Sequence, residues 1–289
     1  MILASENEVL IPDSFLNLYL AEQNEWTVFI AELTTQKAYL ISFSKEPILS
    51  QIIREFPISS GKQKGAKRSE WDLRTPEGFY QIIQFRQQHT LEDKFGTGAF
   101  ILNYPNEIDK ILVKTGGGIW IHGTDRNDFI NFDSEGCIRL KNEDLTFLTK
   151  YLNPGQNPVF IVDKIEWKSE TDLIRKKDQI KQRINDWISS QKGQDIFRYL
   201  DFYHPTFYSS TLKMDIGRWT IHSRDKMREN RLNDIIIKDM KIIYQNNYLL
   251  IQGVEEHTTE LNTDSVSKHI LWQYIDQQWF IVNEDVIEK

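Results

Sequence analysis

The sequence GGGIWIHGT at residues 116–124 is followed, after a polar loop, by SEGCIRL at residues 134–140. The first stretch predicts a strand that carries His122 into a glycine turn. The second predicts a glycine turn that carries Cys137, the only cysteine of the chain. Arg139 follows two positions later, so in an extended segment its side chain lies on the same side as that of Cys137.

These three side chains suit acyl transfer. A cysteine attacks as its thiolate, and a nearby histidine takes the proton and later returns it to the leaving amine. Gly136 lets the backbone bend so that amide N–H groups point at a carbonyl oxygen as it becomes negative. The guanidinium of Arg139 can hold a substrate carboxylate in a two-point contact. Taken alone, however, a cysteine is more often a small buried apolar residue, and a lone histidine on a strand is more often structural.

Together the two stretches resemble the signature of the L,D-transpeptidase catalytic domain, also called the YkuD domain. The likeness extends upstream to FPISSGK at residues 56–62 and DLRTPEGFY at residues 72–80, which are similar to early strands of that family. It covers about residues 26–164 and implies a mostly-β catalytic domain. Members of the family cleave the bond after meso-diaminopimelate in the tetrapeptide stem of peptidoglycan, through a thioester on the cysteine.

The resemblance also implies a role for each site residue. Cys137 is expected to be the nucleophile, His122 the base, and the carbonyl of Gly123 the group that orients the imidazole. Arg139 is expected to assist substrate and oxyanion binding, together with the amides of Gly136 and Cys137. The other candidates on the substrate side are Ser134, Thr124 and Trp120. Glu135 stands where many members carry a second histidine; the base is the earlier histidine, so this change leaves catalysis possible and puts the acceptor side in doubt.

The domain organisation is expected to be α+β. A chain of 289 residues favours two domains. We predict an N-terminal helical segment at 1–25, the catalytic domain at 26–164, a connecting helix at 165–194 and a further domain at 195–289. That last part resembles an NTF2-like domain, in which helices precede a curved sheet and close a cone-shaped pocket.

Local patterns predict the individual elements. Residues 26–43 predict a β-hairpin, because two runs rich in β-branched and aromatic residues surround a polar turn. Further strands are predicted at 56–60, 78–85, 99–103, 118–122 and 159–162, and helices at about 46–55 and 142–152, the second capped by Asn142. In the C-terminal part we expect an amphipathic helix at 168–190, a helix with Phe202, Tyr203, Phe207 and Tyr208, a helix with Trp219, and strands at 235–244, 248–256, 270–275 and 279–283.

Composition limits the kinds of ligand and partner that we expect. The net charge of −7 argues against a dedicated nucleic-acid binder, and the scattered histidines suggest no metal site, so no cofactor is expected. One cysteine excludes an intramolecular disulfide. The N-terminal segment contains a cluster of apolar residues that either packs on its own domain or joins two subunits of a homodimer. Its members are Phe15, Leu16, Leu18, Tyr19 and Leu20.

The cellular location follows from the resemblance. No stretch reaches the roughly 20 apolar residues that span a bilayer. The N-terminus lacks the charged start and apolar run of a signal peptide, which leaves a cytoplasmic protein or a removed signal. A peptidoglycan enzyme is expected in the periplasm, with muropeptides as substrates and cell-wall scaffold proteins as possible partners.

The order of the two domains resembles the cell-shape-determining L,D-carboxypeptidases of epsilonproteobacteria. That resemblance implies removal of the terminal D-alanine from tetrapeptide stems, with water resolving the acyl-enzyme. Two alternatives stay open. One is an L,D-transpeptidase that forms crosslinks or attaches proteins, since the same thioester serves both outcomes. The other is a cell-wall binding protein without turnover, in which the pocket of the second domain is the functional site.

Overall fold

The computed structural model describes residues 9–126, 129–192, 195–229, 232, 234–259 and 262–287. The chain forms two compact units, one of Met1–Leu18 with Glu22–Glu170 and one of Tyr19–Ala21 with Thr171–Lys289. Each combines helices with antiparallel strands, and strands predominate in the first. The α+β class expected from the sequence is confirmed.

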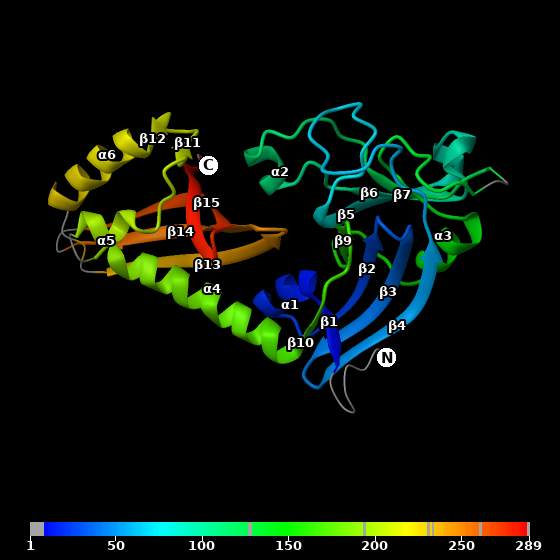
Figure 1. Cartoon of the computed structure of the whole chain (residues 1–289), viewed down its shortest axis with the longest axis horizontal. Helices are drawn as coiled ribbons and strands as arrows, with labels where there is room; N and C mark the ends of the chain where they lie inside the picture. Colours follow the sequence, from blue (N-terminus) through cyan, green and yellow to red (C-terminus); the bar gives the residue numbers. More distant parts are fainter. Residues whose placement is uncertain are drawn as a thin grey trace. The chain divides into compact units, whose positions relative to one another are not determined.

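The first unit is built on one mixed sheet of eight strands in the order β4-β3-β2-β9-β5-β6-β7-β8. Pairing is parallel between β2 and β9 and between β7 and β8, and antiparallel elsewhere. Figure 1 shows β2, β3 and β4 side by side. The strands are β2 (Glu25–Glu32), β3 (Lys37–Lys45), β4 (Ile48–Pro57), β5 (Gly78–Gln87), β6 (Gly98–Leu102), β7 (Trp120–His122), β8 (Ile138–Arg139) and β9 (Pro158–Val162).

Smaller elements complete this unit. They are β1 (Leu10–Pro12), which pairs with β10 (Trp167–Ser169), and the short helices α1 (Leu16–Leu20), α2 (Glu107–Ile111) and α3 (Asn142–Leu148). The predicted N-terminal helical segment is thus a strand followed by a short helix over residues 10–20. The ring of Phe15 lies 5.2 Å from that of Phe43 and 5.5 Å from that of Phe160. This part of the apolar N-terminal cluster therefore packs on its own domain.

The predicted hairpin at 26–43 is confirmed as β2 and β3, but the predicted helix at 46–55 is wrong. That segment is β4, paired antiparallel with β3 from Lys45↔Ile48 to Lys37↔Pro57. Its β-branched residues Ile48, Ile52 and Ile53 suit a strand, and the open edge of β3 supplies partners for the backbone N–H and C=O groups. Pairing with a neighbour thus outweighs a weak local helix pattern.

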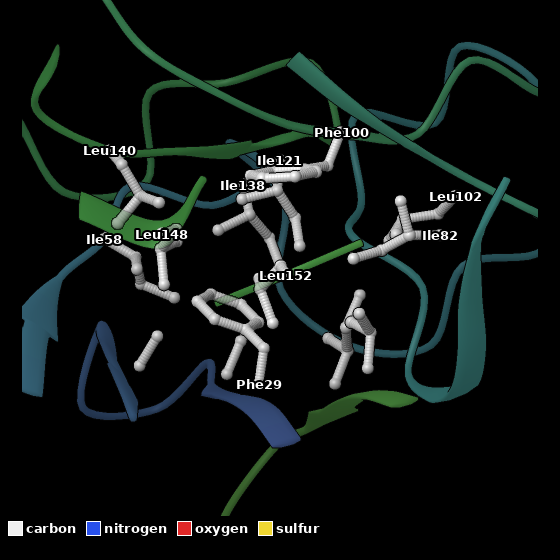
Figure 2. Close-up of a cluster of buried hydrophobic side chains, with 14 of the residues drawn as sticks. Phe29, Ile58, Ile82, Phe100, Leu102, Ile121, Ile138, Leu140, Leu148 and Leu152 are labelled. Carbon is white, nitrogen blue, oxygen red and sulfur yellow. The ribbon is translucent and has the colours of Figure 1, made fainter. Parts of the chain in front are cut away.

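The hydrophobic core of the first unit determines the direction of the site residues. Ile119 and Ile121, at β7, and Ile138 and Leu140, at β8, belong to one buried cluster, most of which Figure 2 shows. Because successive side chains along a strand point to opposite faces, the residues directly before or after these four point away from this core. Those residues include His122, Cys137 and Arg139.

The second unit is a four-stranded antiparallel meander with helices. Its strands are β13 (Asp234–Gln245), β14 (Tyr248–Thr258), β15 (Thr263–Ile275) and β16 (Gln278–Val286), preceded by α4 (Glu170–Ser190), α5 (Ile196–Leu200), β11 (Tyr208–Ser209), β12 (Met214–Asp215) and α6 (Ile216–Glu229). In Figure 1 the long helix α4 runs beside this sheet. The ring of Trp187 on α4 meets that of Trp272 on β15 at 5.9 Å, edge to face. The segment predicted as a connector therefore packs, through Trp187, on the second unit.

One prediction in the second unit is wrong. The helix expected to carry Phe202, Tyr203, Phe207 and Tyr208 ends at Leu200, and these aromatics lie in the turns and short strand that follow. Tyr203 pairs with Ile281 of β16 through an isolated bridge, so pairing with the sheet replaces the next helical turn. Trp219 lies on α6 as predicted.

Candidate active site

His122 and Cys137 lie on two short neighbouring strand segments of the first unit. β7 and β8 run parallel, with Ile121 opposite Ile138 and His122 opposite Arg139. Cys137 immediately precedes β8. The side chains of His122, Cys137 and Arg139 all line one cavity of about 520 Å³. The structure therefore brings together the three residues on which the sequence argument depends.

The imidazole of His122 has a defined orientation. Its Nδ1 lies 2.6 Å from the carbonyl oxygen of Gly123, and the ring of Phe95 packs edge-on at 5.0 Å. A carbonyl can only accept, so Nδ1 carries the proton and Nε2 is the basic nitrogen. Burial lowers the pKa of His122 to about 4 against the opposing effect of the Gly123 hydrogen bond. The ring is therefore neutral at neutral pH.

The thiol of Cys137 is half-buried and protonated at rest. Burial raises the pKa of Cys137 to about 11, and the backbone N–H of Trp120 offsets only part of this effect. Its Sγ donates to the carbonyl oxygen of Gly118 at 3.4 Å. Within the described residues, no hydrogen bond joins Sγ to the imidazole of His122. The thiol must therefore rotate away from Gly118 before His122 can take its proton.

A tight turn presents the cysteine. The Oγ of Ser134 donates to the carbonyl of Cys137 at 2.6 Å and accepts from the N–H of Gly136 at 3.1 Å. Gly136 has φ +127°, and a Cβ there would lie 2.8 Å from the carbonyl oxygen of Arg74. Only glycine can adopt this positive φ and also fit beside that oxygen without strain. Ser134, expected on the substrate side, therefore braces the turn.

The expectation for the amide of Gly136 needs a correction. That N–H was expected to serve the oxyanion, yet it is already used by Ser134. The N–H of Cys137 has no partner among the residues that the structure describes. A donor for a developing oxyanion thus remains at the cysteine itself.

Arg139 is held by an acidic partner and keeps one donor unused. Its Nη2 lies 3.1 Å from Asp133 Oδ2 and 3.3 Å from Ser59 Oγ. Arg126 and Lys62 contact the same carboxylate, at 2.6 and 4.0 Å. The hydrogen bond from Arg139 lowers the pKa of Asp133. The side chain of Arg139 is 8% exposed, and its Nε has no hydrogen-bond partner in the described part of the chain. A guanidinium on a residue that lines a cavity, with one N–H still without an acceptor, suits an incoming anion.

Sequence reasoning assigned Asn142 the wrong role. It does not cap α3; its Oδ1 accepts hydrogen bonds from the backbone N–H groups of Thr97 and Thr124, at 3.0 and 3.1 Å. A Cβ on Gly123 would lie 2.3 Å from this oxygen. Asn142 therefore fixes the turn that follows His122. The two remaining candidates, Thr124 and Trp120, both line the cavity.

The second unit has its own cavity of about 340 Å³, lined in part by Lys268, Glu284, His257 and Trp219. Lys268 Nζ lies 2.5 Å from Glu255 Oε1 and 2.7 Å from Glu284 Oε1. Burial favours the protonated form of Glu255, but Lys268 and His257 outweigh this effect and lower its pKa. Among the residues described, no group of three His, Cys, Asp or Glu side chains is placed to hold a metal ion. Nor does any described helix have the length and apolar character of a membrane span.

Comparisons with known proteins agree with this architecture. Residues 28–161 match the YkuD family, described as the L,D-transpeptidase catalytic domain. The chain is similar to the structure of Bdellovibrio bacteriovorus Bd1075, with 24% identity and a TM-score of 0.70 over 97% of this chain and 99% of that chain. It is also similar to the helical cell shape determining protein Pgp2 from Campylobacter jejuni, with 23% identity and a TM-score of 0.68 over 94% and 98%. Both likenesses show a shared fold. No curated protein sequence matches the chain.

Proposed function

We propose, on the premise that residues 28–161 belong to the L,D-transpeptidase catalytic domain family, that this protein is a periplasmic L,D-carboxypeptidase of peptidoglycan. It removes the terminal D-alanine from tetrapeptide stems and leaves tripeptides. One observation carries the proposal: the side chains of Cys137, His122 and Arg139 line the same cavity. A thiol, a neutral base and an anion-binding donor are the groups that this hydrolysis requires.

The first half of the reaction forms a thioester. Sγ of Cys137 leaves the carbonyl of Gly118, gives its proton to Nε2 of His122 and attacks the carbonyl carbon of the third stem residue. The amide N–H of Cys137 donates to the oxygen as it becomes negative. His122 then gives the proton to the leaving amine of D-alanine. Arg139 binds the carboxylate of that D-alanine through Nε and holds the scissile bond in place.

In the second half of the reaction, water resolves the thioester, and His122 again takes and returns a proton. Water gives a proton to His122 Nε2 and attacks the thioester carbon, and the tripeptide carboxylate leaves as Sγ regains its proton. The carbonyl of Gly123 stabilises the imidazolium in both halves, because the Nδ1–H keeps donating to it. A ring with a low pKa returns its proton readily, which suits a base that must recover after each step.

The likeness to Pgp2 over both units supports a role in cell shape. The description of the matched family favours a second candidate, an L,D-transpeptidase in which an amine in place of water resolves the thioester. Both reactions share the thioester, so the products distinguish them.

Digestion of purified tetrapeptide muropeptides tests the proposal. The wild-type protein is expected to yield tripeptides, and Cys137→Ala none. Crosslinked dimers in place of tripeptides would establish the transpeptidase. A protein that forms neither product and whose Cys137 is not acylated by a carbapenem, as read by intact-protein mass spectrometry, would be a wall-binding protein without turnover.

A further inference from the structure

Asp133 is the carboxylate at which three cationic side chains of the cavity meet. Its Oδ2 accepts hydrogen bonds from Arg139 Nη2 at 3.1 Å and from Arg126 Nη1 at 2.6 Å, and its Oδ1 lies 4.0 Å from Lys62 Nζ. All four residues line the cavity that Cys137 also lines. Of these four side chains, the proposed reaction uses only that of Arg139.

The backbone fixes the place of Asp133. Its N–H donates to Ser59 Oγ at 3.1 Å. The backbone of the next residue, Ser134, donates to residue 60 and accepts from residue 62, at 3.0 and 2.9 Å. Ser59 is fully buried, and it exchanges two backbone hydrogen bonds of 2.9 Å with Arg139. The segment that begins at Ser59 therefore sets the places of both Asp133 and Arg139.

In the described part of the chain, the guanidinium of Arg139 is held through Nη2 alone. This nitrogen contacts Asp133 Oδ2, Ser59 Oγ and the carbonyl oxygen of Ile130, at 3.1, 3.3 and 3.4 Å. Asp133 is the only carboxylate that pairs with Arg139 among the residues that the structure describes. A guanidinium has five N–H donors. Asp133 therefore leaves donors of Arg139 over for a second carboxylate.

Arg139 depends on this carboxylate to keep its place. Its side chain is 8% exposed, and a cation so buried is costly without an ionised partner. Its other two acceptors are a neutral hydroxyl and a neutral carbonyl, at distances that are long for hydrogen bonds. The hydrogen bond from Arg139 lowers the pKa of Asp133, and the charges of Arg126 and Lys62 act in the same direction. Asp133 is therefore an ionised partner at neutral pH.

We infer that Asp133 is a positioning residue, which holds the guanidinium of Arg139 in the place where it binds the terminal carboxylate of the stem. The inference rests on the proposed function, because it concerns how the proposed carboxylate-binding group is kept in place. An arginine side chain that is already held loses less conformational freedom when it binds a ligand. Asp133 thus strengthens carboxylate binding through Arg139 without touching the substrate. A carboxylate that merely competed with the substrate for Arg139 would have the opposite effect.

Binding to the Cys137→Ala protein, measured by calorimetry, tests this inference without turnover. The probes are a tetrapeptide muropeptide with a free terminal carboxylate and the same muropeptide with a terminal carboxamide. The amide is expected to bind about 10-fold more weakly than the acid, because it lacks the charge that Arg139 binds. Adding Asp133→Asn should reduce this ratio to about 3-fold or less by weakening the acid alone. Asp133→Glu, which keeps the charge, should retain more of the ratio.

Two controls separate positioning from a general loss of structure. Asp144→Asn removes a buried carboxylate that pairs with Arg54 in the same unit. Asp144 does not line the cavity, so this variant should leave the ratio of acid to amide binding unchanged. The second control is a protein that carries Arg139→Gln, whose ratio should be about one. Adding Asp133→Asn to it should not change the ratio further, because Asp133 acts through Arg139.

Three effects of Asp133→Asn would overturn the inference: an unchanged ratio, equal weakening of both probes, or tighter binding of the acid, as expected of a competing carboxylate. Equal binding of the two probes by the Cys137→Ala protein, or binding of neither, would also overturn it. Turnover by the wild-type protein is scored separately. A ratio that depends on Asp133 without any tripeptide product rejects the proposed hydrolysis alone. Tripeptide product without that dependence rejects the positioning role alone.

Discussion

The side-chain oxygen of Asn142 lies 3.1 Å from the backbone nitrogen of Thr124, two residues beyond His122. The same oxygen also accepts from Thr97 N at 3.0 Å. One side chain on α3 thus ties two loops together next to the imidazole of His122. Asn142 can affect the reaction without touching the substrate, because it positions the turn that follows His122.

Replacing Asn142 by alanine is therefore expected to lower kcat more than it raises KM. Two N–H groups would lose their acceptor, at a cost of about 1 to 3 kcal/mol of unfolding free energy each. A displaced imidazole should reduce kcat by about 10-fold or more. Steady-state kinetics and thermal unfolding of Asn142→Ala measure both effects. Thr149→Ala, an exposed change at the end of the same helix, is the control; equal losses in the two variants would contradict a positioning role.

The pH dependence of kcat/KM should show an acid limb near pH 4, well below the usual value for histidine. Burial lowers the pKa of His122 to about 4, so its Nε2 stays unprotonated until the pH falls through that value. Activity is thus present above this pKa and is lost below it. An acid limb near the ordinary histidine pKa of about 6.5 would show that the imidazole is solvated in the working enzyme.

An independent measurement concerns the thiol itself. Alkylation of Cys137 by iodoacetamide requires the thiolate. Burial raises the pKa of this thiol to about 11, so the alkylation rate of the free enzyme should still rise with pH well above neutrality. A rate that levels off near neutral pH would indicate a thiolate paired with an imidazolium, contrary to the resting arrangement described above.

Substitution Gly136→Ala should impair both folding and catalysis. The added Cβ would lie 2.8 Å from the carbonyl oxygen of Arg74, at a residue with φ +127°. The turn must shift, and the amide of Cys137 shifts with it, so a loss of about 10²-fold in kcat is expected. The matched control is Gly155→Ala, which has a left-handed φ of +75° but no atom near the new Cβ. It should cost about 1 kcal/mol of stability and leave kcat unchanged.

Substitution Lys268→Met should strongly destabilise the second unit. It leaves the buried carboxylates of Glu255 and Glu284 without their shared cation, at an expected cost of about 3 to 5 kcal/mol in unfolding free energy. Adding Glu255→Gln should recover part of this loss, because one buried charge is removed. Denaturant unfolding of the two variants measures the difference. A Lys268→Met protein as stable as the wild type would show that water solvates this cluster.

The sequence predicted the elements that repeat a clear local pattern. Three elements could be recognised from the periodicity of their apolar side chains and from the turn residues beside them. They are the hairpin of β2 and β3, the amphipathic helix α4 and the strand leading to His122. Helix prediction failed at 46–55 and at the aromatic segment after Leu200, where pairing with a distant strand satisfies the backbone. Such pairing depends on residues far along the chain, which no local pattern contains.

The sequence by itself determined which groups are available to the site: one thiol, one histidine after a strand, glycines where the backbone must turn, and an arginine two residues beyond the cysteine. Only the tertiary structure decided how these groups are tuned. Burial makes the imidazole neutral and keeps the thiol protonated, Ser134 takes the amide expected for the oxyanion, and Asn142 holds a turn instead of capping a helix. The reason is physical: residue type sets what a group can donate or accept, whereas its solvation and its partners depend on segments that meet only when the chain has folded.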